Sequence, residues 1–260
     1  MSENKLKKAL ITFIAYIIII GTGMYVSYHI LGAKYSTPEM FNYFWITEII
    51  LSILVVFVTF KYFSLEEVGL SKRVNKKQLL WILPSTLIIV LIIVGEITSI
   101  TQNGLDESQI KSLMLIGGTT ILVGFSEELM FRGIILNTAL KNYGKLKAIF
   151  ISSLAFGLLH TVNVLAGLSF SQMIFQFVLT SIFGLLFALI YIRINNILPL
   201  MVFHFLWDFS LISETITGYT SNIPMGYLTI TGILIEVVLI LILLKKNNSN
   251  ISNDNLHLSS

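Results

Sequence analysis

Three ionisable residues lie within an apolar stretch of the sequence, and their spacing indicates two different uses. Glu127, Glu128 and Arg132 occur in GFSEELMFRG, residues 124–133. On a helix, Glu128 and Arg132 are four residues apart, share one face and can form a salt bridge. Glu127 points about 100° away from Glu128 and does not share that arginine. The spacing therefore predicts one glutamate with a structural role and one that faces a cavity, where its carboxylate is available for chemistry.

Two further apolar stretches each contain a polar residue pair at helical spacing. In FGLLHTVN, Phe156 and His160 are four residues apart and Asn163 follows three residues later; in HFLWD, His204 and Asp208 are four apart. Each pair occupies one helix face and can point into a helix bundle. Carboxylates and imidazoles at one site are the usual groups for proton transfer in catalysis.

The elements that carry these residues are predicted to be membrane-spanning helices. The chain has 260 residues, of which 55% are hydrophobic and 12% charged, and its mean hydropathy is +0.84. A soluble domain is about one quarter charged, and several apolar runs reach the roughly 20 residues that cross a bilayer as a helix. We predict an all-α polytopic membrane helix bundle. The alternating segments of a transmembrane β-barrel are absent from the sequence.

We predict one transmembrane domain, residues 1–246, followed by a polar disordered tail, residues 247–260. The apolar first segment, about 20 residues long, lacks an Ala-x-Ala exit and is interpreted as a retained anchor rather than a signal peptide. The fourth span is expected to continue as a helix toward Leu140. Eight spans are expected, over residues 10–31, 44–63, 79–95, 112–133, 147–162, 172–192, 197–213 and 227–244.

The basic residues predict that both termini are cytoplasmic. With eight spans, 14 of the 17 Lys and Arg residues fall on one side, whereas only Lys34 and Lys111 fall on the other and Arg132 lies within the membrane. The side with the excess is the cytoplasmic one. At 1.5 Å per residue, Glu127 lies about 20 Å from the inner end of its helix, and the polar residues of the other two spans lie at similar depths. We therefore expect one water-filled cavity between the midplane and the cytoplasmic face.

Charged groups at this depth need a compensating partner or a function. Each costs about 3 kcal/mol at the bilayer centre by insertion scales, so Glu127, Glu128 and Arg132 together would cost about 9 kcal/mol. That sum is comparable to the whole stability of a typical domain. Glu48 and Glu236 also fall within apolar segments but match none of the pairs above. We interpret them as interhelical polar contacts or cavity-lining residues.

Taken in order, the three motifs resemble the signature of the CPBP family, the CAAX-protease and bacteriocin-processing family of intramembrane proteases, also called the Abi family. The family motifs are Glu-Glu-x-x-x-Arg, Phe-x-x-x-His and His-x-x-x-Asn/Asp. Here they read EELMFR at 127–132, FGLLH at 156–160 and HFLWD at 204–208. The resemblance covers residues 112–210, the motif-bearing core. Asp208 stands where many members carry Asn, which leaves its role open.

The resemblance implies an intramembrane endopeptidase that hydrolyses a peptide bond near the cytoplasmic half of the membrane. The chain has no cysteine and no defensible Ser-His-Asp set, so the expected nucleophile is water activated by a carboxylate or a metal ion. By analogy with the family, Glu127 would be the general base and His160 would orient the water or share its proton. His204 and Asp208 would hold the oxyanion.

A metal site is the second interpretation of the same residues. His160, His204 and one or two of Glu127, Glu128 and Asp208 resemble the two-histidine, one-carboxylate set of hydrolytic zinc sites. The family has been described both as metalloprotease and as glutamate-dependent protease. The sequence leaves the choice between a Zn²⁺ cofactor and none open.

The other motif residues are assigned structural roles. By the resemblance, Glu128 and Arg132 would hold their helix in register. Polar side chains in membrane bundles often serve only helix–helix hydrogen bonds, so a purely structural salt bridge is the preferred interpretation of this pair. Phe156 is expected to pack beside the pocket, and Asn163 to cap a helix or line the pocket.

Two other function classes compete with the endopeptidase. One is a non-proteolytic bacteriocin-immunity or binding protein on the same fold, which the uninterrupted motifs disfavour. The other is a transporter with a proton relay, which the lack of inverted repeats disfavours. The expected partners are a peptide or membrane-protein substrate and the lipid bilayer, with no nucleic acid. Ile, Lys and Asn usage and short loops suggest a multi-pass protein of a bacterial plasma membrane.

Overall fold

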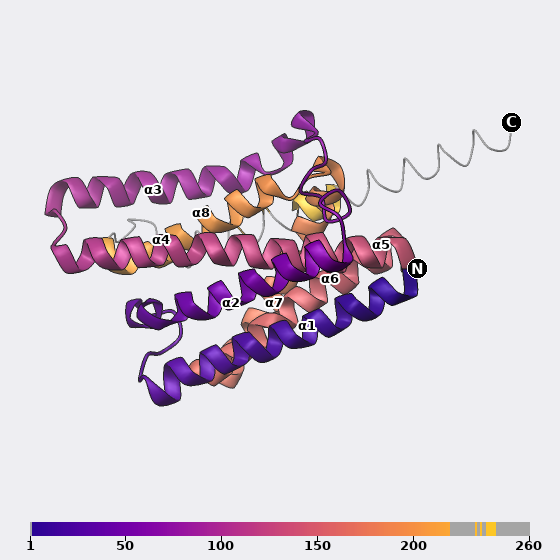
Figure 1. Ribbon diagram of the computed structural model, residues 1–260. Helices are drawn as coiled ribbons and strands as arrows, with labels where there is room; N and C mark the ends of the chain where they lie inside the picture. The colour runs from indigo at the N-terminus through magenta and orange to yellow at the C-terminus, as the bar shows by residue number, and fades with distance from the viewer. Residues whose placement is uncertain (1, 219–231, 233–234, 236–237, 243–260) are drawn as a thin grey trace, which may run out of the picture.

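The protein is an all-α helix bundle, as predicted. The computed structural model describes residues 2–218, 232, 235 and 238–242, and this part of the chain contains no strand. Its helices are α1 (Ser2–Tyr25), extended by a π-helical turn (Val26–Ile30), α2 (Pro38–Tyr62), a 3₁₀ turn (Lys76–Trp81), α3 (Leu83–Asn103), α4 (Glu107–Glu128), a π-helical segment (Leu129–Leu136), α5 (Asn137–Tyr143), α6 (Lys145–His160), a 3₁₀ turn (Thr161–Ala166), α7 (Phe170–Ile194) and α8 (Leu198–Thr217) (Figure 1).

Six of the predicted spans overlap helices that can cross a membrane by length and composition. Among the described residues these candidates are Asn4–Ile30, Pro38–Tyr62, Leu83–Asn103, Glu107–Tyr143, Lys145–Ala166 and Phe170–Ile194. The seventh predicted span corresponds to α8, which is not one of the six. The predicted span 227–244 lies mostly outside the described residues, and the tail 247–260 lies wholly outside them. The count of eight and the cytoplasmic termini therefore stay predictions.

Local sequence signals set where several helices begin. The Asp106 carboxylate accepts the Gln109 N–H at 2.8 Å at the start of α4, and the Ser169 hydroxyl caps α7 in the same way. These are capping boxes, in which side chains satisfy backbone N–H groups that the first turn leaves free. Proline occurs in the first turn of α2, α3 and α8, where it does not remove a helical hydrogen bond.

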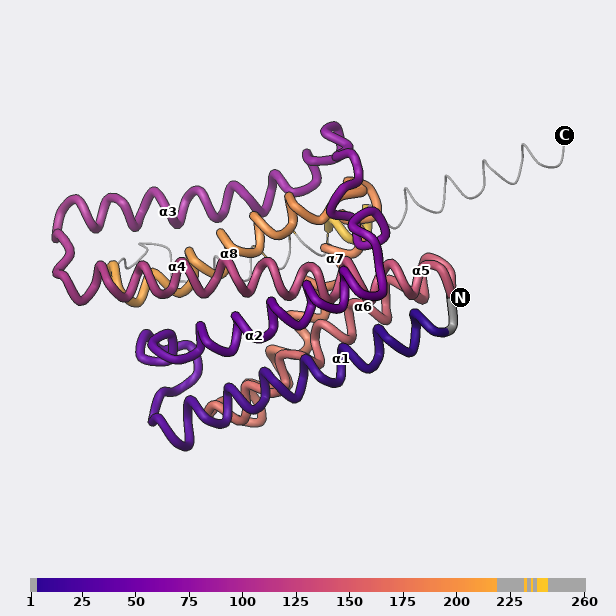
Figure 2. The backbone as a smooth tube through the Cα atoms, in the orientation of Figure 1, coloured from indigo at the N-terminus to yellow at the C-terminus, as the bar shows by residue number. Residues whose placement is uncertain are grey.

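The helices run up and down, so their connections gather at two ends of the bundle (Figures 1 and 2). One end carries the N-terminus, residues 63–82 and the α5–α6 and α7–α8 links. We call it the basic end because twelve of the described Lys and Arg residues lie there: Lys5, Lys7, Lys8, Lys61, Lys72, Arg73, Lys76, Lys77, Lys141, Lys145, Lys147 and Arg193. The opposite end carries the α1–α2 loop, residues 31–37, together with residues 104–106 and 167–169.

Glu67 ties three elements together at the basic end. Its carboxylate lies 2.7 Å from the Lys5 ammonium of α1 and 2.8 Å from the Lys141 ammonium of α5. Hydrogen bonds from Lys141 and Lys5 lower the pKa of Glu67 to about 2. These contacts fix the N-terminal helix against the end of the long Glu107–Tyr143 helix.

Glycine allows the helices around the site to approach closely. A Cβ atom at Gly124 would lie 2.8 Å from the Met201 carbonyl oxygen and 2.9 Å from the Phe205 nitrogen, so α4 and α8 are almost in backbone contact there. A Cβ atom at Gly184 of α7 would lie 3.1 Å from the Ser153 Cα of α6. Small residues at such crossings are typical of membrane helix interfaces. The first crossing brings two motif-bearing helices, α4 and α8, together, and the second packs the third, α6, against α7.

Candidate functional site

The predicted salt bridge between Glu128 and Arg132 is confirmed. The Arg132 Nη1 donates to the Glu128 Oε1 at 2.8 Å, and both side chains are 0% exposed. The guanidinium carbon lies 4.4 Å from the centre of the Phe156 ring and 5.2 Å from that of Phe187. Arg132 Nε and Nη2 have no hydrogen-bond partner among the described residues, so the electron-rich ring faces contribute further stabilisation of this charge.

Arg132 lies in a π-helical segment that the sequence did not reveal. The long helix was expected to continue past residue 133, and it does so to Tyr143, but residues Leu129–Leu136 are π-helical. All eight residues of this segment are buried. π-Helical turns within α-helices occur frequently at functional sites. The hydrophobic pattern of this segment gives no signal for the change in helix type.

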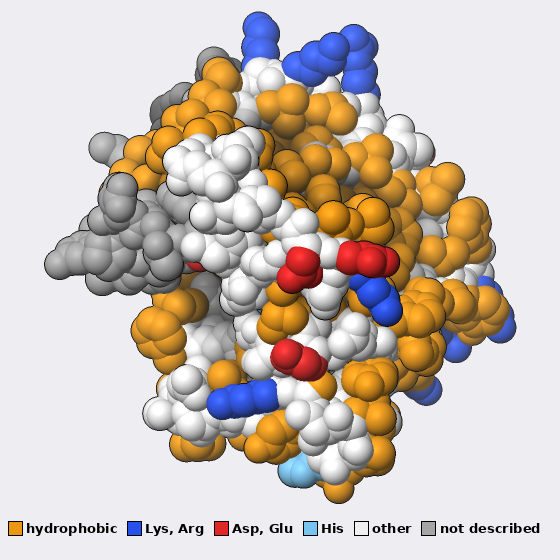
Figure 3. Space-filling model, turned by 90° about the vertical axis from the view of Figure 1, so that its left-hand side faces the viewer, with side chains coloured by type: hydrophobic (Ala, Val, Ile, Leu, Met, Phe, Trp, Pro, Cys, Tyr) orange, Lys and Arg blue, Asp and Glu red, His pale blue; other side chains and the backbone are white. Residues whose placement is uncertain are grey.

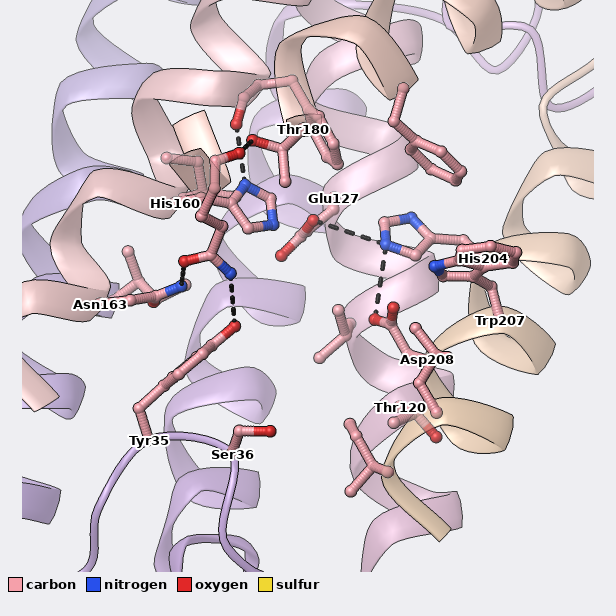
Figure 4. Close-up of a pocket in the computed structure, with 18 of the residues that line it drawn as sticks. Tyr35, Ser36, Thr120, Glu127, His160, Asn163, Thr180, His204, Trp207 and Asp208 are labelled. Carbon is pink, nitrogen blue, oxygen red and sulfur yellow. Dashed lines mark hydrogen bonds and ion pairs between the residues drawn. The ribbon is translucent and has the colours of Figure 1, made fainter. Parts of the chain in front are cut away.

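His204 joins the two adjacent glutamates. Its Nδ1 donates to the Glu128 Oε1 at 3.0 Å, and its Nε2 lies 3.8 Å from the Glu127 Oε2. The same Nε2 lies 3.5 Å from the Asp208 Oδ2 one turn along α8, as drawn in Figure 4. Glu128 therefore does more than hold its own helix in register, because a carboxylate on one ring nitrogen fixes the orientation of the other.

Glu127 faces a cavity, as its helical position predicted. We call it the central cavity; it has a volume of about 390 Å³. Glu127 is 5% exposed, and its Oε2 accepts no hydrogen bond within the described part of the chain. The four predicted catalytic residues and the two predicted pocket residues all line this cavity: Glu127, His160, His204, Asp208, Phe156 and Asn163. The predicted meeting of three helices at one site is therefore observed.

His160 ends α6 beside the cavity with one ring nitrogen already occupied. Its Nδ1 donates to the Phe156 carbonyl oxygen at 3.0 Å, so its Nε2 is the nitrogen left for the cavity. Figure 4 shows Glu127 between His160 and His204. The Phe156 ring lies edge-on to both imidazoles, with centroid distances of 4.9 Å to His160 and 5.9 Å to His204. Phe156 therefore fixes both histidines as well as Arg132.

A polar chain at the cavity was missed in the sequence. Asn163 donates to the Gln176 Oε1 at 2.9 Å, and the Gln176 Nε2 donates to the Tyr35 hydroxyl at 2.8 Å (Figure 4). Burial raises the pKa of Tyr35 to about 12. Gln176 is a polar residue within an apolar span and was detectable on that ground. Tyr35 lies in a loop and gave no signal.

Two further glutamates, Glu48 and Glu96, are buried between helices. Glu48 of α2 lines the cavity, and its Oε2 accepts from the Ser126 hydroxyl of α4 at 3.2 Å, so it is both a cavity liner and an interhelical contact, as expected. Glu236 lies outside the described residues. Glu96 was placed beyond the predicted third span, 79–95, but α3 continues to Asn103 and buries it against Ser213, 2.7 Å away.

The predicted depth of the cavity is wrong. We expected it between the midplane and the basic end, which we predict to be cytoplasmic from its Lys and Arg residues. Its described lining instead includes Tyr35 and Ser36 of the opposite loop and no residue of 63–82, 143–145 or 194–198. At 1.5 Å per residue Glu127 lies about 30 Å from Glu107 and about 24 Å from Tyr143. It sits near the middle of its helix, and the cavity extends from there away from the basic end.

In the described part of the chain the predicted metal ligands are not gathered as a set of three, and the choice between a Zn²⁺ cofactor and none stays a prediction. No group of three or more His, Asp or Glu side chains there is arranged to hold a metal ion. His204 uses its Nδ1 for Glu128, and His160 uses its Nδ1 for a carbonyl oxygen. We therefore derive no step through a metal.

The fold and the site define an integral, multi-pass membrane protein with glutamate and histidine side chains gathered at a buried cavity. Residues 109–210 match the family model described as type II CAAX prenyl endopeptidase Rce1-like. This match confirms the resemblance to the CPBP, or CAAX-protease, family over the segment that contains all three motifs. Comparisons with curated proteins and with solved structures gave no match.

Proposed function

We propose that the protein is a CAAX-protease-like intramembrane endopeptidase in which Glu127 activates a water molecule at the central cavity. One observation carries the proposal. Three helices bring Glu127, His160 and His204 to one cavity, and a Glu127 carboxylate oxygen there accepts no hydrogen bond from any residue that the structure describes. The family match over the same helices supports this assignment.

The first step is attack by water on the peptide carbonyl carbon. The Glu127 carboxylate takes one water proton as the new carbon–oxygen bond forms and the carbonyl π electrons move onto oxygen. His160 Nε2, whose ring partner Nδ1 donates to a carbonyl oxygen, accepts the second water O–H hydrogen bond and orients the nucleophile. General-base assistance of this kind contributes about 10²- to 10⁴-fold to a rate.

The second step is stabilisation and collapse of the tetrahedral intermediate. In its protonated form His204 donates from Nδ1 to Glu128 and from Nε2 toward the cavity, where the oxyanion develops. A donor held in place before the reaction stabilises such an oxyanion more than water does. Collapse breaks the carbon–nitrogen bond, and the proton held by Glu127 passes to the leaving amine. Asp208, 3.5 Å from the His204 Nε2, positions that donor.

The test is a peptidase assay on protein purified in detergent or reconstituted in vesicles. Glu127→Gln removes the base with little change in shape, and Glu66→Gln, at an exposed carboxylate, is the matched control. We expect cleavage by the wild-type and control proteins and a rate about 10²- to 10⁴-fold lower with Glu127→Gln. Cleavage by Glu127→Gln at the wild-type rate would contradict the assignment of the base.

Two alternative functions can be tested with the same variants: a metal-assisted protease and a binding or immunity protein. A metal-assisted version of the reaction predicts loss of cleavage with a chelator and recovery with Zn²⁺, whereas the glutamate mechanism predicts no change. A binding or immunity protein on this fold predicts protection against a peptide toxin that persists in both Glu127→Gln and Glu127→Ala. The apolar lining of the cavity suits a peptide ligand in either case.

A further inference from the structure

The charge distribution of the folded chain assigns a side of the membrane to each end of the bundle. Twelve of the described Lys and Arg residues lie at the basic end, against Lys34 and Lys111 at the opposite end. Four carboxylates lie at or near the opposite end: Glu39, Asp106, Glu107 and Glu214. Figure 3 views this end, and Asp and Glu side chains gather near the middle of its face. An excess of Lys and Arg marks the cytoplasmic side.

The central cavity lies on the other side of Glu127 from the basic end. On α4 its lining continues from Glu127 to Val123 and Thr120, toward the helix start at Glu107. On α8 it continues from Asp208 to Leu211 and Ile212, toward the helix end at Thr217. It reaches Tyr35 and Ser36 in the loop between α1 and α2. The exposed residue among these, Ser36, marks the rim of the cavity at the opposite end.

Packed side chains close the path from the basic end to Glu127. Every residue of Leu129–Leu136 is buried, and the residues of α7 from Leu186 to Ile190 are at most 1% exposed. The Phe183 and Phe187 rings stack at 4.2 Å beside His204, and the salt bridge of Arg132 lies beneath the site. Interiors packed in this way leave no room for a peptide.

We propose that the central cavity opens on the side of the membrane away from the cytoplasm and receives an apolar segment of a peptide presented from that side. The substrate class is thus a translocated or externally supplied peptide rather than a cytoplasmic one. The apolar lining, which includes Phe41, Phe44, Trp207 and Leu211, selects apolar side chains next to the cleaved bond. The cleavage part of this inference rests on the proposed function; the sidedness does not.

Single cysteine residues test the sidedness directly, because the natural chain has none. Ser36→Cys places a thiol at the cavity rim, and Ser71→Cys places one at the basic end; both serines are exposed. Gln102→Cys, near the end of α3, reports on the opposite end independently of the rim. Intact cells are treated with a charged, membrane-impermeant maleimide.

We expect labelling of Ser36→Cys and Gln102→Cys in intact cells, and of Ser71→Cys only after permeabilisation. The reverse pattern would overturn the proposal. If Ser36→Cys fails to accumulate, Gln102→Cys against Ser71→Cys still decides the orientation.

A second measurement links the rim to catalysis. Right-side-out and inverted membrane vesicles are given a quenched fluorescent peptide with an apolar run. We expect cleavage by right-side-out vesicles only, and at least tenfold slower cleavage after maleimide treatment of Ser36→Cys but not of Ser71→Cys. Cleavage confined to inverted vesicles would overturn the inference. Correct labelling without cleavage on either side would contradict the proposed function and leave the orientation standing.

Discussion

The two halves of the bundle are built from similar helices but differ in what fills the space between them. Toward the basic end, residues Leu129–Leu136 are buried throughout and an arginine lies between two phenylalanine rings. Toward the opposite end, the helices enclose a cavity of about 390 Å³ whose lining is mostly apolar and also contains ionisable and amide side chains. We call the half toward the basic end the closed half, because packed side chains fill it. We call the half that contains the cavity the open half, and it holds the groups available for chemistry.

Glu127 and Glu128 lie on the boundary between the halves and differ accordingly. Glu128 is 0% exposed and its Oε1 receives hydrogen bonds from both Arg132 and His204. Among the described residues, the Oε2 of each glutamate accepts no hydrogen bond, but only Glu127 lines the cavity. One peptide unit thus separates a carboxylate that is held from one that is free to take a proton. One helix can therefore carry a structural and a reactive acid at adjacent positions.

Breaking the closed half is expected to have the largest effect. Arg132→Met leaves Glu128 buried without its cationic partner, and loss of one member of a buried pair costs about 3–5 kcal/mol. We expect little folded protein and a lowered thermal midpoint in detergent. The double variant Glu128→Gln with Arg132→Met removes both charges and should recover most of the stability. Equal stability of Arg132→Met and the wild type would show that the pair does not hold this half.

Glu127→Gln should lower the cleavage rate without lowering the stability of the protein. We expect cleavage to fall about 10²- to 10⁴-fold, the contribution of a general base, while the thermal midpoint stays within the scatter of replicate melts. The measurement is initial cleavage rate beside thermal unfolding on the same preparation. A Glu127→Gln protein that is as unstable as Arg132→Met would place Glu127 in the closed half and remove the distinction.

Asp208→Asn tests how His204 is positioned in the open half, and the expected change in cleavage rate is smaller. Asp208 lies 3.5 Å from the His204 Nε2, and an Asn side chain can hydrogen-bond to the same atom. If Asp208 only positions that nitrogen, cleavage should remain within about tenfold of the wild type, since it holds a donor rather than moving a proton. A loss of 10²-fold or more would instead make Asp208 a group that transfers a proton in the reaction.

Local helix geometry accounts for what the sequence predicted about the site. The pairs at four-residue spacing all meet: Glu128 with Arg132 at 2.8 Å, the Phe156 and His160 rings at 4.9 Å, and His204 with Asp208 at 3.5 Å. Such contacts follow from the helix alone. The all-α class follows similarly from run length and hydropathy.

Contacts between helices were beyond the sequence because they depend on packing. The bond from His204 to Glu128 requires α8 to lie against α4, and Gly124 permits that approach only when Met201 and Phe205 face it. The depth of the cavity was misjudged because distances were counted from one end of each helix. The loop residue Tyr35, 2.8 Å from Gln176, joins the cavity through tertiary structure that no spacing encodes.

The smallest expected effect lies at the surface of the basic end, where Glu67 is bonded to Lys141 and Lys5. The pKa of Glu67 is lowered to about 2 from its ordinary value of 4.5, so its stabilisation is fully present above about pH 4.5 and is lost as the pH falls through 2. A partly exposed ion pair contributes about 0.2–1 kcal/mol. Glu67→Gln should therefore lower the thermal midpoint slightly at pH 7, by less as the pH falls from about 4.5 to 3, and not at all well below pH 2.

The same substitution also tests whether the halves are independent. Glu67 lies at the far end of the closed half from the cavity, so Glu67→Gln should leave the cleavage rate per folded molecule unchanged. Thermal melts at pH 7 and pH 3 with raised salt provide the control, because screening weakens a surface pair. A large fall in cleavage rate without a fall in stability would show that the basic end governs the geometry of Glu127 and His204, and the two halves would then have to be treated as one unit.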